Sequence, residues 1–208
     1  ASDVYKRQAD GRIKVSEKSL KRLRKQIEQA EQALDEAHEE LVRIEGKGFI
    51  SGTDSAIAKA ANRLQEQKLV NASVNEALKI LMLIRLRNLQ DIAMLLSKAN
   101  DDDRLAQFRN EQRQRQRDVD AVADSVTQWR ETSSREQGLA GESLAALVSS
   151  TEVGGAKLKK VHSERLELAQ KTLLLLQRID DELRDVKVTF RRLNHELVRA
   201  RGILWDWY

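Results

Sequence analysis

The sequence predicts an all-α protein, an elongated antiparallel up-down-up-down bundle of four long helices with coiled-coil (heptad) packing. The first observation is that none of the 208 residues is proline, which breaks helices from within. The second is that apolar residues recur at alternating steps of three and four, which places them on one face of a helix. The third is that the periodic stretches are joined by short segments, and short connections make successive helices antiparallel neighbours.

The first two helices are predicted from caps and apolar stripes. The first is expected from the N-cap Ser16 to Gly46. Its stripe comprises Leu20, Leu23, Ile27, Ala30, Leu34, Ala37, Leu41 and Ile44. The second helix is expected from Thr53 or Asp54 to about Ala99. Between residues 78 and 86 it is apolar nearly all round, which is typical of a central helix covered on several sides.

The third and fourth helices fill the second half of the chain. The third follows the acidic segment 100–103, and Gly138 and Gly141 predict a kink or break between residues 132 and 142. The fourth is expected to run from about Gly155 to the last residue. Its first stripe comprises Leu158, Val161, Leu168, Leu175 and Ile179, and its second Leu183, Val186, Phe190, Leu193, Leu197, Ala200, Leu204 and Trp207.

The opening residues differ from the rest of the chain. Residues 3–8 resemble the in-frame translation of a transposon end used to prepare sequencing libraries. We therefore expect residues 1–11 to be a disordered or non-native leader, with a technical scar at 1–8. Residues 12–208 are expected to form a single helical-bundle domain from a longer protein. No signal peptide or membrane-spanning apolar run occurs within the chain, so cytoplasm and periplasm both stay open.

Basic residues are concentrated in the segments that an antiparallel bundle would bring to one end. The candidate docking residues for an anionic partner are Lys14, Lys18, Lys21, Lys25, Arg109, Arg113, Arg117, Arg191 and Arg192. The alternative for each stripe is an ordinary solvated helix face. The segment 109–118 has no apolar core residue, so it is equally consistent with a partly hydrated layer of the core.

Three aromatic residues, Trp205, Trp207 and Tyr208, end the chain next to this basic region. Such a cluster closes the end of a bundle or docks a neighbouring domain. The alternative is an interfacial anchor beside a membrane.

The sequence contains no pattern that points to catalysis. The absence of cysteine excludes disulfides and thiolate metal sites. The histidines, His38, His162 and His195, are not at metal-ligand spacing, and neither a phosphate-binding loop nor a nucleophile elbow occurs. We therefore expect no catalytic, cofactor or metal site and no small-molecule substrate.

Three functions remain as hypotheses. The first is a non-enzymatic helical scaffold or interaction module that binds a helical protein or a second copy, with weak salt dependence. The second is the soluble arm of a receptor, channel or other membrane-associated protein, with its basic aromatic end near an anionic bilayer. The third, nucleic-acid binding, is less favoured because aromatic residues make up only 4% of the chain and no helix-turn-helix or zinc-finger spacing occurs.

Overall fold

The protein is all-helical in a computed structural model that describes residues 17–46, 52–97, 102–147 and 153–205. The helices are α2 (Glu17–Gly46), α3 (Gly52–Ser97), α4 (Asp102–Ala146) and α5 (Val153–Trp205). The all-α class and the four predicted helices are therefore confirmed. The leader predicted over residues 1–11 lies outside the described residues.

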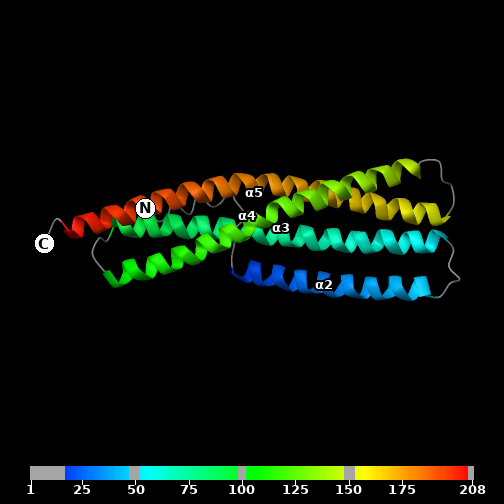
Figure 1. The fold of residues 1–208 in the computed structure, drawn as a ribbon, viewed down its shortest axis with the longest axis horizontal. Coiled ribbons are helices and arrows are strands. Elements are labelled where there is room, and N and C mark those ends of the chain that lie inside the picture. Colours follow the sequence, from blue (N-terminus) through cyan, green and yellow to red (C-terminus); the bar gives the residue numbers. More distant parts are fainter. Residues whose placement is uncertain (1–16, 47–51, 98–101, 148–152, 206–208) are drawn as a thin grey trace.

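Three of these helices build the core of the molecule. α3, α4 and α5 contact one another, most extensively between α3 and α5. Residue numbers along α4 fall where those of α3 and α5 rise (Figure 1). The buried Gln67 of α3, for example, donates hydrogen bonds to Ser133 of α4 and Thr172 of α5.

The remaining helix, α2, lies on the other side of α3. Arg24 of α2 donates to Glu76 of α3 at 2.8 Å. Since Glu76 is in the middle of α3 and Arg24 is seven residues into α2, α2 begins slightly past that midpoint and leaves the C-terminal part of α3 without it (Figure 1). Among the described helices, α2 packs against α3 alone, so the four helices do not surround one common core. α3 contacts all the others, which confirms its predicted central position.

The core consists of two apolar clusters with polar residues between and beyond them. The larger cluster comprises Val74, Ala77, Leu78, Leu81, Ile84, Val119, Val122, Val126, Leu176, Ile179, Leu183, Val186 and Phe190. The smaller comprises Ile92, Leu95, Leu193 and Leu197, with Phe108 packed against it. On α2, by contrast, Leu23 is the only buried residue among the stripe members whose side chains are described, because α2 packs against α3 alone among the described helices.

The first apolar stripe predicted for α5 is largely wrong. Its leucines and valine are only half-buried, and Ile179 alone is fully buried. The buried positions are instead His162, Arg165, Ala169 and Thr172. They continue the three-four spacing of the second stripe backwards along the helix. Thr172 and Arg165 have partners on α3 and α4, and His162 contacts Arg165 of its own helix.

The predicted break in α4 is also wrong, because the helix continues through residues 132–142. Ser133, Glu136 and Ala140 of this segment are buried. Ser133 accepts a hydrogen bond from α3, and Glu136 forms an ion pair with Arg165 of α5. These contacts outweigh the poor helix propensity of two glycines, about 1 kcal/mol each.

The continuous helix predicts that Gly138→Ala stabilises the protein. A Cβ atom at Gly138 would meet no atom within 4 Å, and alanine favours the helix by about 0.8–1 kcal/mol. Denaturant unfolding should therefore show a gain of up to that size in the free energy of unfolding. Gly154→Ala is the control, because its Cβ would lie 2.6 Å from Cγ2 of Thr53 and should destabilise the protein. A loss of stability in Gly138→Ala would contradict a regular helix at this position.

Candidate functional site

The predicted basic residues of α2 lie beside the middle of the molecule. Lys14 and the side chain of Lys18 are outside the described residues, whereas Lys21 and Lys25 are exposed on α2. Their neighbour Arg24 pairs with Glu76, which fixes their level along α3.

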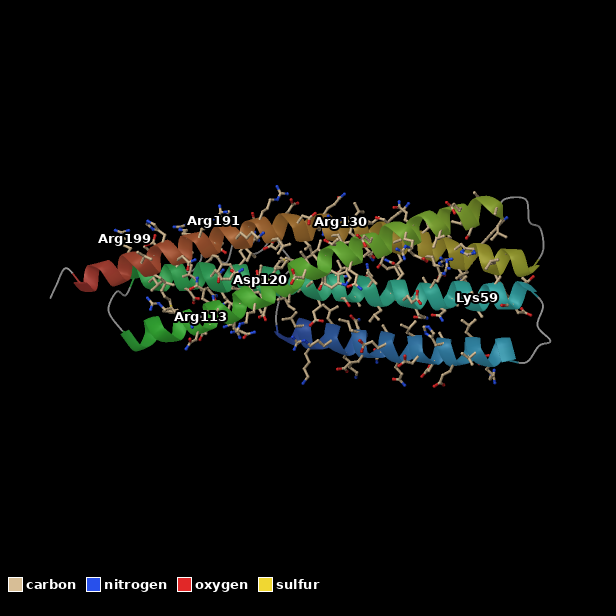
Figure 2. All side chains as sticks on the ribbon, viewed as in Figure 1. Lys59, Arg113, Asp120, Arg130, Arg191 and Arg199 are labelled. Carbon is tan, nitrogen blue, oxygen red and sulfur yellow. The ribbon has the colours of Figure 1, made fainter. Side chains whose placement is uncertain are left out.

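The predicted basic residues of α4 and α5 lie further along the molecule. Arg109 is half-buried, and Arg113, Arg117, Arg191 and Arg192 are exposed. A hydrogen bond from Gln112 of α4 to Asn194 of α5 places the two groups at the same level. Figure 2 nevertheless shows Arg113 and Arg191 on opposite edges of the molecule.

The structure therefore does not gather the predicted cations on one surface. Arg115 of α4 contacts Asn88 of α3, twelve residues beyond the Glu76 that pairs with α2. At 1.5 Å per residue, the two levels are about 18 Å apart. The physical reason is the offset of α2, which begins near the middle of α3 and not at its end. Of the candidate aromatics, Trp207, Tyr208 and the side chain of Trp205 lie outside the described residues.

The offset helix creates a groove between α2 and α3 with a volume of about 620 Å³. Both walls are made of helix side chains. The lining residues are Arg22, Leu23, Gln26, Gln29, Ala30, Ala33, Gln65, Lys68, Asn71, Ala72, Asn75 and Lys79. The groove thus combines three cations, five amides and small apolar residues, and its lining includes no carboxylate.

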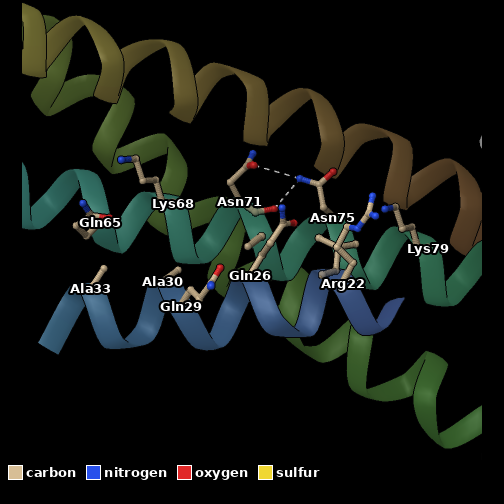
Figure 3. Close-up of a pocket in the computed structure, with 12 residues that line it drawn as sticks. Arg22, Gln26, Gln29, Ala30, Ala33, Gln65, Lys68, Asn71, Asn75 and Lys79 are labelled. Atoms are coloured by element: carbon tan, nitrogen blue, oxygen red, sulfur yellow. Dashed lines mark hydrogen bonds between the residues drawn. The ribbon is translucent and has the colours of Figure 1, made fainter. Parts of the chain in front are cut away.

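The geometry of the groove favours an elongated anionic partner. Figure 3 shows Arg22 and Lys79 at one end of the groove and Lys68 nearer the other, with most of the amides between them and Gln65 beyond Lys68. Asn75 donates to the side-chain oxygen of Asn71 at 3.1 Å, and Asn71 donates to Thr172 at 2.9 Å. One wall of the groove is therefore tied to the core, which holds it in place.

The polar segment 109–118 turns out to contain a core residue, Arg115. This side chain is 8% exposed and donates to Asn88 at 2.8 Å. It also forms ion pairs with Asp91 at 2.6 Å and Glu111 at 3.3 Å. Nothing about its residue type predicts burial, because it is one of four arginines in a polar segment. Its position in the three-four series with Val119 and Val122 was the available signal.

A second buried cluster joins α4 and α5. Arg165, 2% exposed, pairs with Glu136 and approaches Nδ1 of His162 at 2.7 Å. Since a guanidinium only donates, Nδ1 must accept and the ring proton must sit on Nε2. Burial lowers the pKa of His162 below the usual 6.5, and the Arg165 and Arg63 cations lower it further, against an opposing effect of Glu136.

Both buried clusters are ionic contacts within the core. The arginines, carboxylates and His162 are bonded to one another between packed helices. Over the described ranges, no three His, Asp or Glu side chains are grouped so that they could hold a metal ion. No helix in the same ranges is long and apolar enough to cross a bilayer.

Comparison with protein-family models, curated proteins and solved structures finds no match for this chain. The function must therefore be inferred from the chain's own residues.

The buried histidine predicts a specific loss of stability in acid. Because the pKa of His162 is lowered in the folded protein, the unfolded chain takes up a proton first as the pH falls through 6.5. The free energy of unfolding should therefore decrease below that pH and be insensitive to this group above it. Denaturant unfolding about one unit either side of 6.5 measures the difference, and His162→Gln should reduce it.

The exposed His38 provides the matched control as His38→Gln. An acid-induced loss that is the same in His162→Gln and in the wild type would show that His162 is not its source.

Proposed function

We propose that the chain is a non-enzymatic helical interaction module, and that the groove between α2 and α3 docks an acidic helical segment. The observation that carries this proposal is the lining of the groove, in which Arg22, Lys68 and Lys79 face a channel without carboxylates. Unlike the two ion clusters of the core, these cations lie where a partner has access to them. An acidic partner would bring the missing counter-charges.

The shape of the groove supports a helix as the partner. The groove runs between two long helices, and Ala30, Ala33 and Ala72 in its lining let another backbone approach closely. Five amides can donate to or accept from polar side chains of that partner.

The way in which α3, α4 and α5 pack is part of the same proposal. We propose that α3, α4 and α5 pack as an antiparallel coiled coil. Its support is the three-four spacing of buried residues, such as Val119, Val122 and Val126 on α4 and Val186, Phe190 and Leu193 on α5. A rigid rod of this kind keeps α3 straight, and the groove depends on α3 for one of its walls.

We expect the docking of an acidic helix to depend strongly on salt, in contrast to the weak salt dependence expected from the sequence alone. Partly exposed charges are screened within about 8–10 Å at physiological salt, so added salt should weaken the docking of an acidic helix. Uncharged amide contacts would be less affected.

A binding experiment tests the groove directly. The probe is a fluorescent model helix with glutamates along one face, and fluorescence anisotropy measures its dissociation constant. Lys68→Glu with Lys79→Glu should weaken binding roughly tenfold or more, because two attractions become repulsions. Lys160→Glu with Lys171→Glu is the matched control, since both lysines are exposed on α5, away from the groove. Equal losses in the two double variants, or no binding by the wild type, would contradict the proposal.

The outer face of α5 favours a second candidate, docking on an anionic membrane surface. Val188 is 60% exposed and Val198 is 73% exposed, and both lie near the exposed Arg191 and Arg192. Apolar residues among cations suit the headgroup region of an anionic bilayer.

Vesicle sedimentation tests this second candidate. Vesicles with phosphatidylserine should bind the protein, and vesicles of phosphatidylcholine alone should not. Arg191→Glu with Arg192→Glu should lower binding by roughly thirtyfold, at about 1 kcal/mol per basic residue. Arg113→Glu with Arg117→Glu changes the other edge of the molecule and should have less effect. If both pairs reduce binding equally, the α5 face is not the docking surface.

A further inference from the structure

The charges of α2 are sorted along its length. Its basic part carries Lys21, Arg22, Arg24 and Lys25, and the acidic part that follows carries Glu28, Glu31, Asp35, Glu36, Glu39 and Glu40, with Arg43 after them. Such an order limits ion pairs between the two parts of one helix, because pairing requires residues three or four apart. The two parts are therefore complementary to each other in a helix that runs the opposite way.

One side of α2 forms a second row beside the stripe that packs on α3. The row comprises Arg22, Gln26, Gln29, Ala33, Glu36 and Glu40, at steps of four and three. Its first four members line the groove. A row with this spacing is what a helix presents to a second helical neighbour. Among the described helices, α2 has only α3 as a neighbour.

The order of residues in this row is self-complementary. It begins with a cation, continues through two amides and an alanine, and ends with two carboxylates. In an antiparallel pair of identical rows centred on Gln29, Glu36 of one copy lies opposite Arg22 of the other. The two-fold symmetry repeats the contact, as in isologous dimers.

The α3 wall of the groove adds a second cation to the contact between Glu36 and Arg22. Lys79 of α3 lies with Arg22 at one end of the groove (Figure 3). A carboxylate from the second copy would therefore meet two cations. Glu36 is exposed and accepts a 3.3 Å hydrogen bond from Gln32 of its own helix. A single exposed amide contact leaves its second oxygen and its charge available to that copy.

We infer that the acidic helix docked in the groove is α2 of a second copy of this chain, running antiparallel to the first α2. The inference rests on the proposed docking of an acidic helix and names its source. In the pair, Glu36 of each copy contacts Arg22 and Lys79 of the other. The two α2 helices lie between two α3 helices, and the groove of each copy is filled.

The expected dimer is weak and sensitive to salt. The 30 residues of α2 give a helix about 45 Å long, and a contact strip about 10 Å wide covers roughly 450 Å². Stable interfaces bury about 800 Å² per partner, so micromolar dissociation is expected. Sedimentation equilibrium over a range of micromolar concentrations is the suitable measurement.

Charge exchange tests the contact. Arg22→Glu and Glu36→Lys each turn both symmetry-related contacts from attraction to repulsion, so each variant alone should dimerise about a hundredfold more weakly. Mixing the two variants should restore a heterodimer, because the introduced glutamate of one chain then meets the introduced lysine of the other. The natural Glu36 of the first variant also meets the natural Arg22 of the second. A single chain with both substitutions should recover the homodimer.

Matched controls keep the result specific. Lys187→Glu and Glu167→Lys make the same charge changes at exposed positions on α5 and should leave the wild-type association unchanged. Far-UV circular dichroism verifies that every variant stays helical. If a single variant loses its helicity, the chain with both substitutions still tests the contact, because it should dimerise like the wild type.

The outcomes separate this inference from the proposed function. A wild-type chain that stays monomeric but binds the glutamate-rich model helix overturns the second copy as partner and leaves the groove intact. A monomer that binds no acidic helix overturns both. A dimer that persists in Arg22→Glu and in Glu36→Lys, or a mixture that forms no heterodimer, places the interface elsewhere and overturns the inference.

Discussion

The packing of α3 between two unlike neighbours is the constraint on which the rest of the molecule depends. One side of α3 contributes Val74, Leu78 and Leu81 to the main apolar cluster with α4 and α5. The opposite side carries α2, whose register is marked by the ion pair of Arg24 with Glu76. A helix with two covered sides needs apolar residues nearly all round, which fits the first part of the segment 78–86, where α2 begins, whereas Leu86 beyond it is 44% exposed. The groove exists because α3 has enough apolar surface to bind α2 on its second side, while no other described helix covers α2.

Polar layers fix which residues face each other within the core. Gln67, Ser133 and Thr172 form one layer, and Arg115 with Asn88 and Asp91 forms another. Removing one partner of a buried ion pair costs about 3–5 kcal/mol, so a shift of α4 by one turn would leave charges without partners. Purely apolar seams would tolerate such shifts more readily. The layers therefore set the alignment of the rod and, through α3, the position of one wall of the groove.

The sequence was sufficient for the class, the four helices and the central place of α3, because proline-free three-four periodicity determines these. It was insufficient for the polar half of the core. Arg165 and Thr172 look like surface residues until their partners Glu136 and Gln67 are known, and those partners lie far away in the chain. It was also insufficient for the candidate site. An antiparallel bundle with its helix ends level would bring the Lys21 and Arg113 stripes to one end, whereas the start of α2 is set by which part of α3 its apolar stripe fits. No pattern of residues within α2 or α3 alone predicts that offset.

The offset of α2 has a consequence for the reach of a paired molecule. Beyond the start of α2, the body narrows to α3, α4 and α5, and Leu86 and Met94 of α3 are partly exposed there. Two copies joined through antiparallel α2 helices would direct their narrow arms away from each other. The end of α5 lies roughly 34 residues, or about 50 Å, beyond the level of Gln29. The dimer would hold the two ends of its α5 helices, which carry arginines, about 100 Å apart. The paired α2 helices would join the two molecules at the centre, and the dimer would act as a spacer of fixed length.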